Sequence, residues 1–168
     1  MKKLILLGLL WAKIVLAQGY TEAWIEPTAI HVEILGGDQK LFNWVVIDPV
    51  GKWAEFYFGP NLNLGPVILS PGLGIETSPT IWRMGCSASL ETKNFFGLLV
   101  SEAGGSGFFW RTIAQARQKD LRVGVMGETN RGWGPRVDLS GKRFNVFLFK
   151  PLLGGKPHRV VGGLKYTF

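Results

Sequence analysis

The stretch that decides the fold is Val160-Val161-Gly162-Gly163-Leu164-Lys165-Tyr166-Thr167-Phe168. Successive side chains of a β-strand point to opposite faces, so the stretch can be divided into two sets at a period of two residues. One face then carries Val160, Gly162, Leu164, Tyr166 and Phe168, and the other carries Val161, Gly163, Lys165 and Thr167. The pattern predicts a strand that is apolar on one side, polar on the other, and aromatic at its last residue.

This strand resembles the closing strand of Gram-negative outer-membrane β-barrels, a family in which a terminal aromatic and apolar residues at alternate positions are recognised by the insertion machinery. The resemblance implies that Leu164, Tyr166 and Phe168 form such a β-signal. It also implies two partners, the lipid bilayer and the insertion machinery, and leaves the oligomeric state open. The alternative is an ordinary amphipathic last strand of a soluble β protein.

The other end of the chain predicts export. Lys2 and Lys3 are followed by an apolar run over residues 4–12, and Val15-Leu16-Ala17 fits a signal-peptidase site before Gln18. The run is too short for a spanning helix, which needs about 20 apolar residues. We therefore expect a signal peptide over residues 1–17, a single β-barrel domain over residues 18–168, and localisation in the outer membrane.

The composition agrees with a lipid-facing barrel. Hydrophobic residues make up 46% of the chain and charged residues only 18%. A soluble domain of about 150 residues buries only about 70% of its surface, so it would leave much of this apolar material exposed to water. The outside of a membrane barrel is apolar by requirement. The formal charge is +7, but the basic residues are scattered singly, so no nucleic-acid partner is expected.

Turn residues divide the chain into alternating segments and predict an all-β, antiparallel, up-and-down transmembrane β-barrel of about ten strands, with eight or twelve as alternatives. The expected strands are residues 23–35, 41–48, 52–58, 80–91, 94–103, 107–118, 121–128, 133–139, 143–150 and 160–168. Residues 61–78 are rich in Pro, Gly and Asn, and we expect an outer loop or a plug there. Twelve strands would result if residues 64–76 spanned the wall.

The faces of these strands can be assigned from the same alternation. The turns at 49–51, 92–93, 119–120 and 141–142 would share the periplasmic end with Phe168. On the apolar face we expect Phe96, Leu98 and Val100. An aromatic girdle would be formed by Trp82, Trp110, Trp133, Tyr166 and Phe168.

The polar face predicts a charge network in the lumen. Its expected members are Arg83, Arg111, Arg117, Arg122, Glu128, Arg136 and Asp138. Buried charges must be paired, so we expect ion pairs between neighbouring strands, first of all among Arg122, Glu128, Arg136 and Asp138. The network would fill the barrel as a polar plug; a narrow anion-favouring pore or a small-ligand cavity is the alternative.

No catalytic constellation is evident. His31 and His158 are the only histidines, and Cys86 is the only cysteine, so neither a metal-ligand spacing nor a cofactor motif is present. The sequence thus predicts an outer-membrane barrel with a structural or narrow-pore role and no catalysis. The alternative is a soluble periplasmic or secreted barrel that binds an apolar ligand, and a lipid-modifying enzyme is a third. The first two differ in which face is inside. Val123 faces lipid in the membrane barrel and the interior in the soluble barrel.

Overall fold

The computed structural model describes residues 18–26, 29–154 and 160–168. These residues form thirteen strands, of which twelve close into an antiparallel barrel and one, β5, lies outside it. The strands follow one another as β1 (Gln18–Glu26), β2 (Ala29–Gly37), β3 (Leu41–Asp48), β4 (Trp53–Pro60), β5 (Leu62–Leu64), β6 (Val67–Glu76), β7 (Trp82–Glu91), β8 (Phe95–Gly104), β9 (Gly107–Gln118), β10 (Leu121–Glu128), β11 (Gly132–Ser140), β12 (Phe144–Phe149) and β13 (Val161–Thr167). The main expectation of about ten strands is therefore wrong, and the alternative of twelve is correct.

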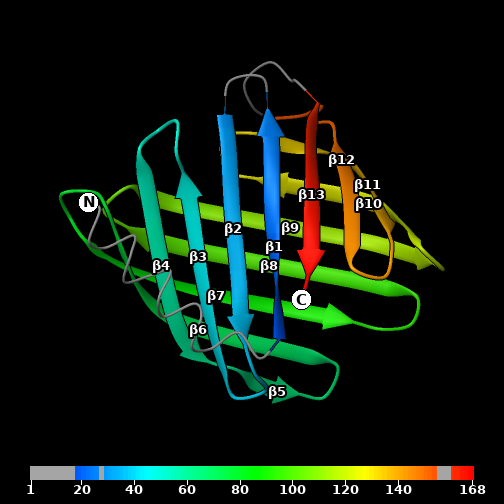
Figure 1. The fold of residues 1–168 in the computed structure, drawn as a ribbon, viewed down its shortest axis with the longest axis horizontal. Coiled ribbons are helices and arrows are strands. Elements are labelled where there is room, and N and C mark those ends of the chain that lie inside the picture. The colour runs from blue at the N-terminus through cyan, green and yellow to red at the C-terminus, as the bar shows by residue number, and fades with distance from the viewer. Residues whose placement is uncertain (1–17, 27–28, 155–159) are drawn as a thin grey trace.

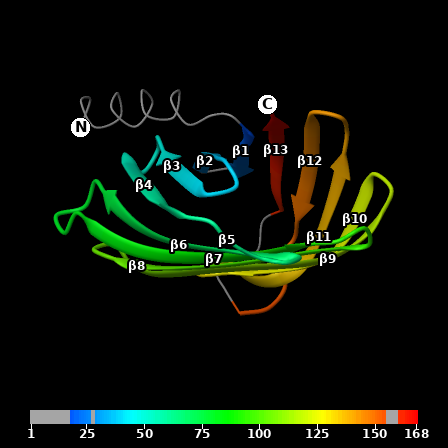
Figure 2. The ribbon, with the colours of Figure 1, turned by 90° about the horizontal axis from the view of Figure 1, so that it is seen from below.

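All consecutive strands pair except β4 and β5, β1 pairs with β13, and the barrel is closed by a seam between β4 and β6. Two walls result: β1–β4 and β13 cross in front of β6–β9 at a steep angle (Figure 1), and the two walls enclose a flattened interior (Figure 2). The Phe168 amide donates to the Gly19 carbonyl over 3.2 Å. We call the end of the barrel at Gly19 and Phe168 the terminal end, and the other end the distal end.

Two strands account for the error in the count. The segment 23–35 was expected as one strand, but β1 and β2 are antiparallel partners whose register ends at Glu26↔Ala29. The segment 61–78 was expected as a loop or plug, but β6 pairs with β7 from Val67↔Leu90 to Ile75↔Trp82. Proline is disfavoured in a central strand, so the segment that contains Pro71 was expected to be a loop and not β6. Pro71 lies between the part of β6 that pairs with β5 and the part that pairs with β4, and proline is tolerated at such a break in a ladder.

The two additional strands change which turns share an end. The turns at residues 92–94, 119–120 and 141–143 lie at the terminal end with Phe168, as the alternation predicts. The turn between β3 and β4, residues 49–52, lies at the distal end, which contradicts the expectation for residues 49–51. At the terminal end, the turn between β2 and β3 is held by Asp38, whose carboxylate accepts from the amides of Lys40 and Leu41. These two bonds lower the pKa of the Asp38 carboxyl.

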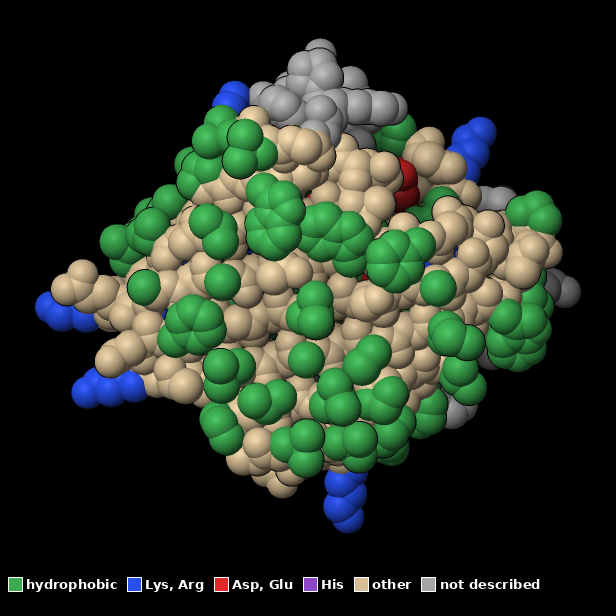
Figure 3. Space-filling model, turned by 180° about the vertical axis from the view of Figure 1, so that it is seen from behind, with side chains coloured by type: hydrophobic (Ala, Val, Ile, Leu, Met, Phe, Trp, Pro, Cys, Tyr) green, Lys and Arg blue, Asp and Glu red, His purple; other side chains and the backbone are tan. Residues whose placement is uncertain are grey.

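The outward face of the barrel is apolar. Val123, Val125, Val137 and Leu148 are exposed, whereas Arg136, next to Val137 on β11, is only 4% exposed and faces inward. Seen from behind, the face over β6–β11 carries hydrophobic side chains throughout, while Lys and Arg side chains project at its margins (Figure 3). None of the residues that the structure describes forms a helix long and apolar enough to cross a membrane.

One strand has the opposite sidedness from the expected one. In β8 the side chains of Phe96, Leu98 and Val100 lie on the same face as the buried Glu102, and Leu99 is exposed on the outer face. The reason is that β8 is apolar on both faces around these residues, so the alternation of polar and apolar residues could not decide between them.

Aromatic and aliphatic side chains fill the middle of the barrel. Trp24, Ile113, Met126, Phe147, Phe149 and Val161 form one buried cluster. The Trp24 and Phe147 rings meet edge to face, with centroids 4.8 Å apart. Room for Phe147 comes from Gly163, because a Cβ there would collide with the Phe147 ring and lie 2.8 Å from the Ala23 carbonyl oxygen. The middle of the barrel is thus a packed core.

This close packing predicts that Gly163→Ala destabilises the barrel by about 1–3 kcal/mol, the usual cost of overpacking. Gly162→Ala is the matched control on the adjacent, outward position, where the nearest atom to the new Cβ would be Leu148 Cδ2 at 3.7 Å. The measurement is urea unfolding in detergent micelles, followed by tryptophan fluorescence. Equal unfolding midpoints for the two variants would contradict close packing of Phe147 against Gly163.

Candidate functional site

The inward face carries arginines surrounded by carboxylates. They form three buried clusters, centred on Arg83, Arg111 and Arg136, and a more exposed group at the terminal end. In each buried cluster the arginine and its carboxylate partners are mostly withdrawn from solvent. Because an unpaired buried charge is costly, these ion pairs determine which side-chain positions the interior can adopt.

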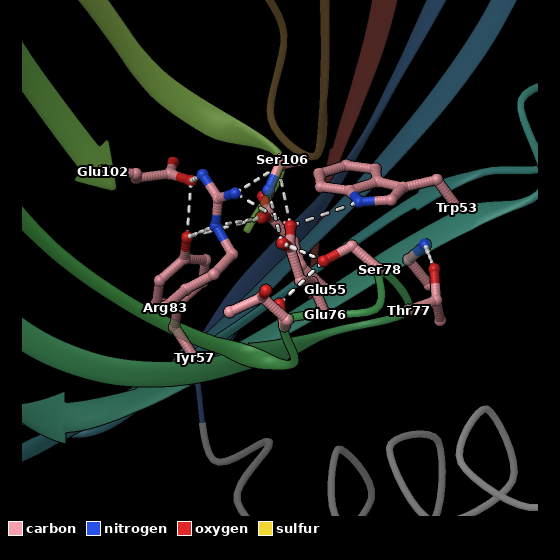
Figure 4. Close-up of polar contacts among 11 residues, drawn as sticks. Trp53, Glu55, Tyr57, Glu76, Thr77, Ser78, Arg83, Glu102 and Ser106 are labelled. Carbon is pink, nitrogen blue, oxygen red and sulfur yellow. Dashed lines mark hydrogen bonds and ion pairs between the residues drawn. The ribbon is translucent and has the colours of Figure 1, made fainter. Parts of the chain in front are cut away.

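Arg83 bonds to carboxylates from three strands, and we call Glu55, Glu76, Arg83 and Glu102 the Arg83 cluster (Figure 4). Arg83 Nε lies 3.0 Å from Glu55 Oε2, Nη1 lies 2.8 Å from Glu76 Oε2, and Nη2 lies 3.3 Å from Glu102 Oε2. The Tyr57 hydroxyl donates to Glu102 Oε2 over 2.6 Å. One guanidinium therefore serves three carboxylates.

The strand register explains how these side chains meet. Glu55 of β4 stands directly opposite Glu76 of β6, and Arg83 of β7 stands opposite Gly74 of β6. Gly74 has no side chain to fill the space between them, and a Cβ there would lie 2.7 Å from the Tyr57 ring. Glycine at this position thus allows Tyr57 to reach the cluster.

Hydroxyl groups hold Glu76 from the distal side. Ser78 Oγ donates to Glu76 Oε1 over 2.6 Å, and Ser106 Oγ donates to Glu76 Oε2 over 2.7 Å. The Ser106 amide also donates to Glu76 Oε1, and Trp53 Nε1 reaches Glu76 Oε2 at 3.4 Å. In Figure 4 these groups surround the Glu76 carboxylate together with Arg83. The position of Glu76 is thereby fixed from several strands and loops.

The second cluster joins opposite walls of the barrel. Arg111 Nη1 lies 2.8 Å from Glu33 Oε1, and its Nε lies 2.8 Å from Glu128 Oε2. Arg131 also pairs with Glu128. The Arg111 guanidinium carbon lies 4.2 Å from the centroid of the Trp24 ring, within the range of a cation–π contact.

The third cluster lies deeper in the barrel. Arg136 forms two bonds to Asp138, of 2.8 and 3.1 Å, and Gln115 Nε2 donates to Asp138 Oδ1 over 2.8 Å. Glu22 lies 3.8 Å from Arg136, and the Phe147 ring lies beneath the guanidinium with its centroid 4.0 Å away. At the terminal end, Arg117 and Arg122 each lie 3.0 Å from Glu91, in a group that is partly open to solvent.

All seven residues that the sequence suggested for the charge network lie on the inward face, but their pairings differ from the expected ones. Glu128 pairs with Arg111 and Arg131 and not with Arg122 or Arg136, and the Arg136–Asp138 pair lies within a single strand. Sequence reasoning missed most of the acidic partners, which are Glu22, Glu33, Glu55, Glu76 and Glu102. Glu22 and Glu76 lay outside the expected strands, so correct boundaries for β1 and β6 would have put them on the inward face. Glu55 lay within the expected strand 52–58, but no face was assigned to it.

The aromatic residues suggested for a girdle face outward at two levels. Trp82, Trp110 and Trp133 lie toward the distal end, where the rings of Trp110 and Trp133 have centroids 5.3 Å apart. Tyr166 and Phe168 lie at the terminal end, with centroids 6.4 Å apart. Leu164, the remaining residue of the expected β-signal, is exposed on the same outward face of β13.

A cavity of about 810 Å³ occupies the distal end of the interior, and we call it the vestibule. Its wall includes Trp24, Trp44 and Trp53 together with members of the Arg83 and Arg111 clusters. Toward the middle of the barrel Trp44 stacks on the buried Tyr57 with ring centroids 5.6 Å apart. Beyond them, a cavity near Ser87 and Val100 measures about 10 Å³, room for about one water molecule. Side chains therefore block the way from the vestibule into this part of the barrel.

The polar groups of the vestibule do not assemble a hydrolytic triad. His31 Nδ1 lies 4.0 Å from Asp48 Oδ2, whereas Ser78 and Ser106 both donate to Glu76, so histidine and serines belong to separate groups. His158 lies outside the described residues. Within the residues that the structure describes, no three His, Cys, Asp or Glu side chains are grouped so that they could hold a metal ion. The chemistry that the arrangement offers is ion pairing and binding.

Comparison with known proteins adds little to this description. No protein-family model matches the chain, and no curated protein matches it. A solved structure described as the NanC porin in a rhombohedral crystal form superposes with a TM-score of 0.47 at 9% sequence identity, over 89% of this chain and 97% of that chain. A likeness at this level of identity and superposition says nothing about what the protein does.

The Arg83 cluster predicts a large effect of Arg83→Met. The substitution would leave three carboxylates without their shared cation, and removing one partner of a buried pair costs about 3–5 kcal/mol. Arg117→Met is the matched control, because Arg117 pairs with the exposed Glu91 and exposed pairs contribute about 1 kcal/mol or less. Urea unfolding of both variants in micelles gives the comparison, and similar losses for the two would contradict the assigned role of Arg83.

Proposed function

We propose that the protein is an outer-membrane β-barrel with a structural role, whose interior is blocked by ion-paired and aromatic side chains. The observation that carries the proposal is the sidedness of the wall. Large apolar side chains face outward and are exposed, and charged side chains face inward and are buried. This is the reverse of a water-soluble fold, and lipid is the solvent that suits it.

The extent of the apolar exterior supports this proposal. Exposed apolar side chains occur on outward positions of strands all round the barrel, among them Ile30, Phe58, Leu73, Met84, Leu99, Val125, Leu139, Leu148 and Leu164. Soluble monomers seldom expose a contiguous apolar patch beyond a few hundred Å². Closure between β4 and β6 also leaves the barrel wall without an unpaired edge, as a strand structure in hydrocarbon requires.

The interior argues against a soluble barrel that binds an apolar ligand. Arg111, Arg136, Glu128 and Asp138 are all buried on the inward face. An apolar ligand in contact with them would remove water from these charges without replacing the hydrogen bonds, which is unfavourable. The packed cluster around Phe147 also occupies the middle of the barrel, where such a ligand would lie.

The same packing favours a structural role over a narrow pore. Trp24, Tyr57, Met126, Phe147 and Phe149 are all almost completely buried within the barrel. Solute passage would require several of these side chains to move together. Barrels with tightly filled interiors serve as scaffolds and do not conduct freely.

Two further parts of the proposal concern delivery to the membrane. Residues 1–17 would be the signal peptide, and the outward residues Leu164, Tyr166 and Phe168 of the last strand would be recognised by the insertion machinery. The outward aromatics at the distal and terminal ends would then lie at the two interfaces of the bilayer, where Trp and Tyr are enriched.

A depth-dependent substitution tests the lipid exposure of the wall. Val125 lies in the middle of β10 and faces outward, so Val125→Arg is expected to cost about 2–4 kcal/mol in folding from urea into lipid vesicles. Leu121→Arg, at the terminal end of the same strand, is the matched control and is expected to cost about 0–1 kcal/mol. Equal losses of folding free energy in Val125→Arg and Leu121→Arg would count against a bilayer around the barrel.

Fractionation and conductance test location and role separately. Expressed with its native signal, the protein is expected in the outer membrane, with an unboiled band that migrates differently from the boiled one. Recovery in the soluble periplasm would overturn the membrane location. In planar bilayers the purified protein is expected to give no stepwise conductance, and regular steps would replace the structural role with that of a narrow pore.

A further inference from the structure

The vestibule contains more carboxylates than arginines. Among the described residues that line it, three guanidinium groups, those of Arg83, Arg111 and Arg131, lie beside four carboxylates. These are Glu33, Asp48, Glu55 and Glu102, of which Asp48 has His31 at 4.0 Å. The arginines pair in addition with Glu76 and Glu128, which do not line the cavity. A small anion entering the vestibule would meet several of these carboxylates, whereas a cation would be attracted. This lining favours a cation over an anion as the occupant of the vestibule.

One of these carboxylates has an unused acceptor. Glu102 is only 3% exposed, and its Oε2 accepts from Tyr57 and contacts Arg83. Its Oε1 is buried without a hydrogen-bond partner, although Glu102 lines the vestibule. A buried carboxylate oxygen without a donor is unfavourable, so a ligand that brings an N–H group to this atom would gain free energy.

Aromatic faces accompany the carboxylates. Trp24, Trp44 and Trp53 all line the vestibule. Trp24 already has the Arg111 guanidinium against its ring, which shows that this wall accommodates a cation over an aromatic face. The cavity volume of about 810 Å³ lies within the range of small-molecule sites, which is about 300–1,000 Å³.

We propose that the vestibule binds a small organic cation that carries primary ammonium groups. One ammonium donates to Glu102 Oε1 beside Glu55, and the aliphatic part of the ligand lies along the tryptophans. This inference goes beyond the structural role proposed above and does not depend on where the protein resides, because the vestibule is formed by the folded barrel alone.

The test compares two probes of the same length, 1,5-diaminopentane and the neutral 1,5-pentanediol. The full chain, folded in a zwitterionic detergent, is titrated with each probe by calorimetry and by tryptophan fluorescence. The diamine is expected to bind saturably and at least about tenfold more tightly than the diol, since a charge-assisted hydrogen bond contributes more than a neutral one. Equal affinity for the two probes, or no saturable binding of the diamine at millimolar concentration, would overturn the proposal.

Three variants locate the binding. Glu102→Gln is expected to weaken diamine binding about tenfold or more, because it removes the charge and keeps the shape of the side chain. Asp48→Asn is expected to weaken it less and preserves the oxygen that accepts from the Gly51 amide over 2.7 Å. Glu91→Gln, at the terminal end, is the matched control and is expected to leave binding unchanged.

The variants also show how the proposal can fail. A loss of binding in Glu91→Gln equal to that in Glu102→Gln would mean that general surface charge, and not the vestibule, attracts the diamine. Each variant is first checked for the heat-dependent shift of the folded barrel on a gel. If Glu102→Gln did not fold, Asp48→Asn would decide, and unchanged binding in that variant would overturn the proposal.

Discussion

Closure of the barrel brings two carboxylates together at its seam, and a single cation pairs with both. The register that joins β4 to β6 puts Glu55 directly opposite Glu76, and like charges in opposite positions destabilise a strand pair. Arg83, from the next strand, lies within 3.0 Å of one carboxylate and 2.8 Å of the other. The guanidinium thus converts a repulsive strand pair into an attractive one, and without closure the apolar exterior and the filled interior could not both exist.

The interior follows from the same requirement that every buried charge have a partner. Arginines from one wall reach carboxylates of other strands, so the clusters connect parts of the chain that are distant in sequence, as Arg111 and Glu33 do. The arrangement satisfies the arginines more fully than the acids, and Glu102 keeps a free acceptor at the vestibule. A scaffold built in this way contains a polar recess as a by-product of its own stabilisation.

Strict alternation was sufficient to predict the faces of β7, β9, β10, β11 and β13, because the charged residues of each strand fall on one face only. It failed where that contrast is weak. Pro71 and the neighbouring glycines concealed β6, and the two apolar faces of β8 led to Phe96 and Leu98 being assigned to the wrong face. The acidic half of the interior was missed for a related reason, since Glu55 and Glu76 meet only through the long-range seam, which no local pattern records.

The seam is also the part of the barrel wall where local opening is expected to be easiest. Its register extends over four residue pairs, from Glu55↔Glu76 to Phe58↔Leu73, whereas the neighbouring β6–β7 ladder extends from Val67↔Leu90 to Ile75↔Trp82. Local opening of a protein begins where few hydrogen bonds must break together. The amides of β4 and β6 that bond across this seam are therefore expected to exchange with solvent deuterium earlier than those of the longer ladders of the barrel wall. A cation bound between Glu55 and Glu102 would make this local opening less frequent. Occupancy of the vestibule would then be measurable as slower hydrogen exchange of the amides in the barrel wall.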